Sequence, residues 1–341
     1  MTYFPFHEYW WFYLGFTGFV LLLLALDLGV FHRKAHAVSF REASLWSAVW
    51  VGLALAFNYG FYRYAAWKLG DEAIGRQLGL EFLTGYLIEL SLSMDNVFVI
   101  ALIFGYFRIP SQHQHRVLFW GILGALIMRG VMIGAGVALI TLMHWLLWVF
   151  GAFLIFSGLN MLLTDSQMDP EKARVVRLAR RLYPVSPNLD GHKFMTVWQG
   201  KRALTPLALV LLLVETTDLI FAVDSIPAIF AVTTKPFIVF TSNVFAILGL
   251  RSLYFVLAGA LGYFRYLKAG LSIVLVSIGV KMLLDPLDGR TPRWFQVEIP
   301  ISVSLLVIAA IILIAIVMSV FAARREKRRG KKPDKKGKPD E

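Results

Sequence analysis

Long apolar stretches, each close to the length of a transmembrane helix, recur along most of the chain. A helix needs about 20 mainly apolar residues to cross the hydrocarbon core of a bilayer. The stretches that qualify are residues 10–31, 43–66, 79–107, 117–140, 144–163, 203–232, 237–262, 269–284 and 300–322. This pattern predicts an all-α polytopic membrane protein with about nine transmembrane helices in one domain, residues 1–322.

The composition agrees with this fold class. Hydrophobic residues make up 58% of the chain and charged residues 16%, whereas soluble domains contain about 45–50% and about 25%. Glu8, and no Lys or Arg, precedes the first apolar stretch, so we do not interpret that stretch as a cleavable signal peptide. Because the chain has no cysteine, disulfides, thiolate metal sites and thiol redox chemistry are excluded.

The positions of the basic residues predict the orientation. With the N-terminus outside, the inner loops and the C-terminal tail hold 25 Lys and Arg, and the outer loops hold 5. Basic residues favour the cytoplasmic side, so we expect an N-out, C-in topology. Most of the net charge of +12 lies in residues 164–202 and 324–341. We interpret these as a cytoplasmic basic loop (164–202) and a disordered basic tail (323–341) that contact anionic lipid, and not as sites for nucleic acid.

Two parts of the chain resemble each other. The segment 89-ELSLSMDNVFVI-100 aligns with 218-DLIFAVDSIPAI-229, and 154-LIFSGLNMLL-163 aligns with 275-LVSIGVKMLL-284. Spans three to five (79–163) therefore match spans six to eight (203–284). Because each unit crosses the membrane three times, the second unit must enter from the opposite side. The sequence predicts two inverted three-helix repeats, an arrangement that places a transport site between them near the middle of the membrane.

Five acidic residues fall within the central parts of spans three and six. Each carboxylate costs about 2.5–3.5 kcal/mol at the bilayer centre, so such residues are usually functional. Arg129 and Arg251 are charge-balancing candidates, and with Lys281 they leave an excess of two negative charges that a divalent cation or two protons would neutralise. The candidate metal ligands are Glu89, Asp95, Glu215, Asp218 and Asp224.

Neutral oxygen donors accompany these acids, namely Asn96, Ser225 and Asn243. Carboxylate and amide oxygens are hard ligands that suit Mg²⁺, Ca²⁺ or Mn²⁺. Residues six apart lie about 120° apart on a regular helix, so we expect a kink or unwinding that turns both acids of a span toward one ion; Pro227 would favour it in span six. The alternative is that acids and arginines form ion pairs that only fix helix packing. Glu81 lies near a span end, where snorkelling explains it.

The motifs themselves resemble a known family. The segments 83-LTGYLIELSLSMDNVFV-99, 148-WVFGAFLIFSGLNMLL-163 and 214-VETTDLIFAVDSIPAIFAVTTKPFIVFTSNVFAILGLRSLYF-255 are similar to the TerC family of integral membrane proteins, close to its Alx-type members. That family is placed with the LysE-type transporters of the bacterial inner membrane; some members are named for tellurite resistance and others export manganese. The resemblance implies that the five acids bind or conduct Mn²⁺.

Two functional hypotheses follow. The first is a secondary transporter that expels Mn²⁺, with proton exchange on the same carboxylates as an open question. The second is a membrane scaffold for a protein partner, such as secretion or stress-response machinery, which the basic loop and tail motivate. No catalytic motif occurs in a suitable context, so we expect neither an enzyme nor a resident cofactor, and Mn²⁺ would be the transported substrate.

Overall fold

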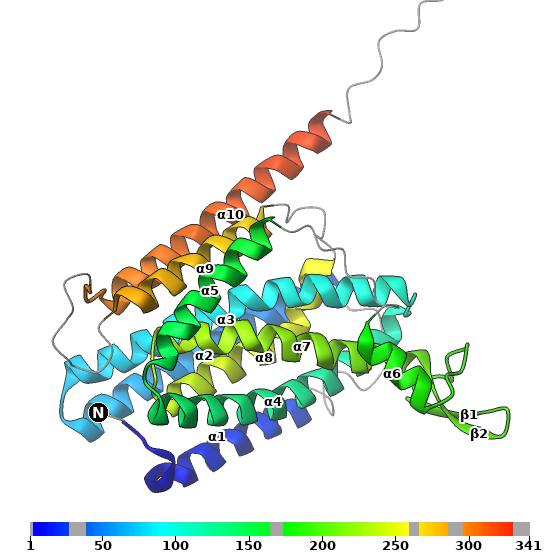
Figure 1. Cartoon of the computed structure of the whole chain (residues 1–341), viewed down its shortest axis with the longest axis horizontal. Coiled ribbons are helices and arrows are strands. Elements are labelled where there is room, and N and C mark those ends of the chain that lie inside the picture. Colours follow the sequence, from blue (N-terminus) through cyan, green and yellow to red (C-terminus); the bar gives the residue numbers. More distant parts are fainter. Residues whose placement is uncertain (1–2, 27–38, 164–172, 259–265, 286–295, 330–341) are drawn as a thin grey trace, which may run out of the picture.

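The computed structural model describes residues 3–26, 39–163, 173–258, 266–285 and 296–329. These residues form ten helices and one short β-hairpin (Figure 1). The elements are α1 (Phe6–Leu26), α2 (Phe40–Leu69), α3 (Glu72–Tyr106), α4 (Ser111–Leu142), α5 (Leu146–Leu163), α6 (Arg174–Leu182), β1 (Met195–Trp198), β2 (Lys201–Leu204), α7 (Pro206–Phe230), α8 (Pro236–Ala258), α9 (Leu267–Leu284) and α10 (Ile301–Arg329).

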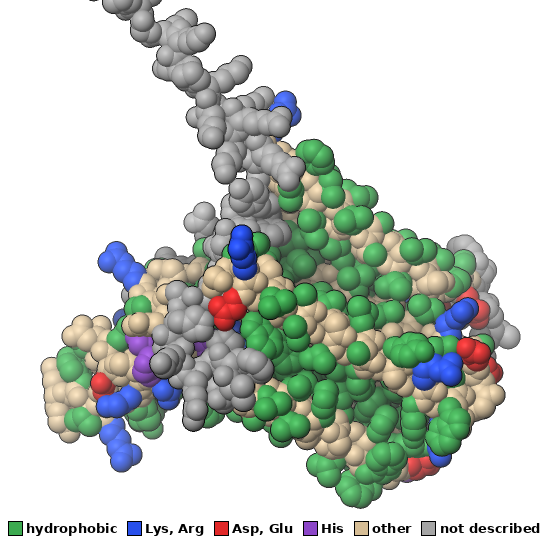
Figure 2. Space-filling view, turned by 180° about the vertical axis from the view of Figure 1, so that it is seen from behind, with side chains coloured by type: hydrophobic (Ala, Val, Ile, Leu, Met, Phe, Trp, Pro, Cys, Tyr) green, Lys and Arg blue, Asp and Glu red, His purple; other side chains and the backbone are tan. Residues whose placement is uncertain are grey.

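Nine of the described helices, all except α6, are long and apolar enough to cross a membrane. The prediction of nine spans in an all-α protein is therefore confirmed. The surface agrees with a bilayer environment: hydrophobic side chains cover the middle of one face, and charged side chains gather toward its two ends (Figure 2). In the membrane this apolar band faces lipid, which explains why large hydrophobic residues are exposed in the isolated chain.

A short turn joins α2 to α3 and extends α3 beyond its apolar stretch. Gly70 ends α2 in the left-handed conformation, with φ of 67°, which glycine adopts without steric cost. The Asp71 side chain then accepts hydrogen bonds from the amides of Ala73 (2.7 Å) and Ile74 (3.3 Å). This N-cap starts α3 at Glu72, seven residues before the predicted start of span three at residue 79.

Contacts between helices define their relative directions. Helices α3 and α8 are parallel. Glu89 of α3 contacts Asn243 of α8, and further along both helices the rings of Phe104 and Tyr254 pack with their centres 5.5 Å apart. Helices α4 and α7 are also parallel, since Gly121 lies against Val214 and the later Gly136 against Phe230.

The inner helix α3 runs antiparallel to α2 and α7. Gly75 lies against Ala66 of α2, and Gly79 lies against the earlier Tyr62. Near its middle, α3 meets the end of α7, where Gly85 approaches Ile229. These directions are the ones that successive crossings of a membrane require.

The helices α5 and α9 pack closely and antiparallel, and with α10 they cross the rest of the bundle at an angle (Figure 1). A Cβ added to Gly279 would lie 2.7 Å from the Gly151 carbonyl oxygen, and one added to Gly158 would lie 2.8 Å from that of Ser272. In the repeat alignment Gly158 corresponds to Gly279 and Gly151 to Ser272. The predicted symmetry between the two repeats therefore maps each of these contacts onto the other. This agrees with the inverted repeat, which stays a prediction.

The basic loop contains a small folded unit beyond one end of the bundle (Figure 1). It consists of α6 and the antiparallel pair β1–β2. His192 joins it to the start of α4 through a 2.9 Å contact between its Nδ1 and that of His113, and Phe194 packs against Arg116 with the guanidinium 5.3 Å from the ring centre. Residues 164–172 of the predicted loop lie outside the described part of the chain.

The predicted tail differs from the structure at its start. Helix α10 continues to Arg329, so residues 323–329 are helical and not disordered as we expected. Arg, Lys, Glu and Ala have high helix propensity, which allows the membrane helix to continue beyond its apolar part. The rest of the tail, 330–341, lies outside the described residues.

Candidate functional site

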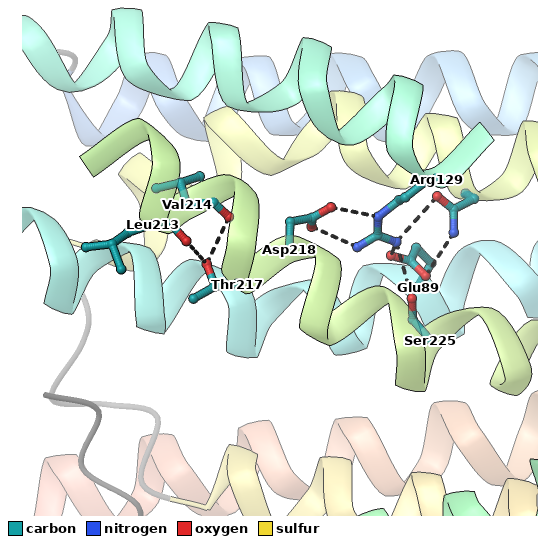
Figure 3. Close-up of polar contacts among 8 residues, drawn as sticks. Glu89, Arg129, Leu213, Val214, Thr217, Asp218 and Ser225 are labelled. Carbon is teal, nitrogen blue, oxygen red and sulfur yellow. Dashed lines mark hydrogen bonds and ion pairs between the residues drawn. The ribbon is translucent and has the colours of Figure 1, made fainter. Parts of the chain in front are cut away.

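A buried arginine in the middle of α4 connects acids from two other helices (Figure 3). The Arg129 side chain is 2% exposed. Its Nε and one terminal nitrogen donate to the two carboxylate oxygens of Asp218 on α7, at 3.1 and 2.9 Å. The other terminal nitrogen forms an ion pair with Glu89 on α3. A guanidinium suits this position because its fixed fork of donors can hold two carboxylates at once.

Two neutral side chains complete this group. Arg129 also donates to the Ser225 hydroxyl at 3.3 Å and to the Asn243 amide oxygen at 3.4 Å. The Asn243 amide nitrogen in turn donates to Glu89 at 3.2 Å. Four helices, α3, α4, α7 and α8, therefore meet here. We call Glu89, Arg129, Asp218, Ser225 and Asn243 the central cluster.

The central cluster is deeply buried and carries an uneven charge. Glu89 is the 18th of the 35 residues of α3, and Asp218 is the 13th of the 25 residues of α7. All five members are buried. With both carboxylates ionised, the single guanidinium leaves a net charge of −1. An uncompensated charge at this depth is costly, so a further cation, either a proton or a metal ion, would be stabilised here.

Two neighbouring residues affect the acids of α7. The Thr217 hydroxyl donates to two backbone carbonyls one turn earlier, each at 2.9 Å, and so does not compete with Arg129 for the Asp218 carboxylate (Figure 3). Gly124 of α4 faces Glu215, and a Cβ at that position would lie 2.0 Å from a carboxylate oxygen. The glycine thus lets Glu215 approach α4, one turn of α7 away from Asp218.

The other two predicted acids lie apart from the central cluster. Asp224 on α7 accepts a hydrogen bond from Ser157 on α5 at 3.0 Å. Asp95 on α3 lies close enough to Lys268 on α9 to interact with its charge. Both carboxylates are half-buried. Each of these acids therefore faces the α5–α9 pair, on equivalent sides of the two predicted repeats.

Helix continuity explains this separation. Both α3 and α7 run without interruption through their predicted acids, two on α3 and three on α7, and Pro227 lies in the last turn of α7 without ending it. Of the kink or unwinding expected in these spans, unwinding does not occur in either described helix, so that part of the expectation was wrong. On a regular helix Glu89 and Asp95 point about 120° apart and meet different neighbours.

The structure therefore does not gather the five predicted acids into one metal cage. In the part of the chain that the structure describes, no group of three or more His, Cys, Asp or Glu side chains could hold a metal ion. Glu89 and Asp218 meet through Arg129, and Glu215 lies next to Asp218. Asp95 and Asp224 lie at separate positions.

Two other predicted residues are buried near this region. The Asn96 side chain is buried beside Asp95, and its Oδ1 has no hydrogen-bond partner among the described residues. Arg251 is buried on α8, about two turns beyond Asn243. Its charge-balancing role, like the ligand role of Asn96, stays a prediction.

Two ion pairs were not predicted: a buried one near the start of α3 and a partly buried one at the end of α9. Glu81 is 2% exposed and pairs with Lys235, in the turn before α8. Lys281 donates to the Ala231 carbonyl at 3.0 Å and lies 3.4 Å from Asp285. The apolar stretch beginning at residue 79 placed Glu81 near a span end, whereas Asp71 starts the helix earlier and makes Glu81 its tenth residue. The signal that could have located Glu81 is this N-cap.

These features define a polytopic membrane protein with a buried ion-pair cluster at the meeting point of four helices. The chain belongs to the TerC family of integral membrane proteins, whose sequence model matches residues 74–327. The nine candidate spans and this family membership confirm the prediction of a multi-pass protein of the bacterial inner membrane.

Several bacterial relatives match over most of their length. The membrane protein STKORF319 of Myxococcus xanthus, named as uncharacterized, is 55% identical over 311 residues, which cover 91% of this chain and 92% of that protein. The Alx protein of Escherichia coli K12 is 45% identical over 319 residues (93% and 96%), and that of Salmonella typhi is 46% identical over 309 residues (90% and 93%). The names of the two Alx proteins propose a role as membrane-bound redox modulators. No solved structure matches the chain.

Proposed function

We propose that this protein is a secondary transporter that exports a divalent metal cation, with Mn²⁺ as its substrate. The observation that carries the proposal is the central cluster: two carboxylates, one on α3 and one on α7, share one buried guanidinium and leave a net charge of −1. Buried ionisable residues in membrane helices usually mark the path of an ion or proton. The proposal includes no enzymatic step and no resident cofactor.

The chemistry of the cluster favours a hard cation. All of its potential ligand atoms are oxygens, from Glu89, Asp218, Ser225 and Asn243. Such donors suit Mn²⁺, Mg²⁺ and Ca²⁺. Mn²⁺ is proposed among them because the motifs resemble a family with manganese exporters. In the structure Arg129 occupies the position between the carboxylates, so we propose that the substrate binds when this guanidinium moves aside.

The other three predicted acids would provide further binding positions for the cation along its path through the membrane. Glu215 lies one turn from Asp218, and Asp224 and Asp95 face the α5–α9 pair. A cation would pass between these carboxylates as the two repeats move against each other. Protons that bind the emptied carboxylates would return in the opposite direction, which is the exchange we propose.

The redox role in the names of the Alx relatives does not require thiol chemistry in this chain. The sequence contains no cysteine. We propose that any redox effect of this protein would arise from the metal ions that it moves.

Cellular manganese content provides a first test. Bacteria without their own manganese exporters would express the wild type, Glu89→Gln or Asp218→Asn, with Glu8→Gln, an exposed acid on α1, as the control. We expect wild type and Glu8→Gln to lower cell manganese at least fivefold, and the two cluster variants to have no effect at equal membrane levels. Equal manganese export by all four proteins would refute the proposal.

A second candidate function is a scaffold for a protein partner. It is favoured by exposed apolar side chains on the small folded unit, where Leu182 and Val197 are 66% and 71% exposed. The double variant Leu182→Ser/Val197→Ser tests it, because a scaffold would lose its cellular effect while a transporter would keep it. The opposite pattern, with loss only in Glu89→Gln and Asp218→Asn, favours transport.

A further inference from the structure

A second buried carboxylate lies on α3, away from the central cluster. Glu81 is 2% exposed, and Glu89 lies eight positions further along the same helix. At the helical rise, this corresponds to about 12 Å along the axis. Glu81 therefore lies between the central cluster and the end of the bundle that is predicted to face outward.

Oxygen-bearing side chains surround the Glu81 carboxylate. The Thr233 hydroxyl donates to Oε2 at 2.6 Å, and the Gln77 amide approaches Oε1 at 3.2 Å. Thr233 is 5% exposed. The Gln77 amide could present its oxygen instead of its nitrogen after a simple flip. Together these groups offer one carboxylate, one hydroxyl and one amide oxygen, which are hard ligands.

A tethered cation already occupies this position. The Lys235 ammonium pairs with Oε1 of Glu81 and is 14% exposed. Its amine also lies 5.5 Å from the centre of the Tyr3 ring. Lys235 thus pairs with Glu81 as Arg129 pairs with Glu89. In each case the basic side chain occupies the position beside a buried carboxylate that a free cation would take.

The site adjoins an open cavity. Gln77 also lines a cavity of about 920 Å³ between the start of α3 and the start of α10. The charged side chains of that cavity are Glu72, Asp285 and Glu298, with Arg76. Lys281 lies 3.4 Å from Asp285, but the acids still outnumber the bases, and this favours the entry of cations and water. Water from the cavity would complete the coordination of an ion that has only a few protein ligands, as Mg²⁺ commonly has.

From this geometry we propose a second cation site, formed by Glu81, Thr233 and Gln77, that takes the divalent substrate between the central cluster and the cavity. Lys235 competes with the metal for this site and is displaced when the metal binds. The assignment of the ligand rests on the proposed transport function. The site itself rests on the contacts of Glu81.

Binding of Mn²⁺ alone to the full-length protein in lipid nanodiscs tests the site. Free Mn²⁺ would be measured by electron paramagnetic resonance for wild type, Lys235→Met, Glu81→Gln/Lys235→Met and the control Lys68→Met, which removes an exposed lysine at the end of α2. We expect Lys235→Met to tighten one class of site at least tenfold, the double variant to lose that class, and Lys68→Met to match wild type. Identical binding by all four proteins would overturn the proposal.

Two further comparisons keep the test decisive. If Lys235→Met leaves Glu81 unpaired and the protein does not fold, the double variant, which has no unpaired charge, still has to bind one Mn²⁺ fewer than wild type at saturation; equal stoichiometry would overturn the site. Tight binding in Lys235→Met without Mn²⁺ flux in wild type would refute the transport proposal and support the site. Flux in wild type with unchanged binding in Lys235→Met would refute the site alone.

Discussion

Arg129 determines whether the central cluster can exist inside the membrane. Its guanidinium makes hydrogen bonds or ion pairs with every other member of the cluster. Two carboxylates without this counter-ion would repel each other in a medium that screens charge poorly. In the proposed transport function, the same residue would also compete with the substrate for the two carboxylates.

Replacing this arginine should weaken the fold strongly. Arg129→Gln leaves Glu89 and Asp218 buried without their charge partner, and breaking a buried pair in this way costs about 3–5 kcal/mol. We expect a large fall in the unfolding midpoint of the detergent-solubilised protein. Arg129→Gln/Asp218→Asn should recover part of the loss, because it removes one of the unpaired charges. Wild-type stability of Arg129→Gln would contradict the ion-pair description.

The sequence identified individual site residues where burying a charged side chain in the membrane is costly. That cost marked Glu89, Asp218 and Arg129, and the structure brings them together. It did not show that Asp95 would lie elsewhere, since the direction of a side chain depends on whether the helix continues. Glu81 was missed because the apolar pattern alone does not locate the N-cap that starts α3.

The close packing of helix α5 against helix α9 depends on glycines, which have no side chain. Gly151 and Gly279 face each other, and Gly158 faces the backbone of Ser272. Small residues allow membrane helices to approach closely enough for their backbones to touch. The sequence alignment of the repeats paired Gly158 with Gly279, but only the packed structure shows that Gly279 meets Gly151 and that Gly158 meets Ser272 across one interface.

A methyl group at this interface should force the helices apart. In Gly279→Ala the new Cβ would lie 2.7 Å from the Gly151 carbonyl oxygen, and such overpacking costs about 1–3 kcal/mol. Gly134→Ala on α4 is the matched control, because nothing lies within 4 Å of its Cβ position. Thermal unfolding in detergent should show a lower midpoint for Gly279→Ala than for Gly134→Ala. Equal midpoints would show that the interface is not close-packed.

For the whole molecule, the apolar pattern was sufficient to predict the number of spans and the fold class. Crossing a bilayer fixes both the length and the composition of a helix, so these properties are visible in the sequence. The folded unit of α6, β1 and β2 was not predicted, since short strands in a basic loop carry no comparable constraint. The N-out, C-in orientation rests on the distribution of Lys and Arg and stays a prediction.

The orientation can be measured because the chain has no cysteine of its own. Single cysteines would be placed at exposed positions, Lys68→Cys at the end of α2 and Lys193→Cys in the small folded unit. A membrane-impermeant maleimide should label Lys68→Cys in intact spheroplasts and Lys193→Cys only after the membrane is opened. The reverse labelling pattern would show that the N-terminus lies inside and the C-terminus outside, which contradicts the predicted topology.

In the proposed function, the central cluster carries a divalent cation across the membrane. The most direct measurement is the initial rate of Mn²⁺ flux into proteoliposomes that contain only this protein and an internal Mn²⁺-quenched dye. We expect rapid quenching with wild type and Glu8→Gln, and at least a tenfold lower rate with Glu89→Gln or Asp218→Asn. If correctly folded wild type shows no flux with a proton gradient of either sign, or if the cluster variants match it, the central cluster does not carry the cation.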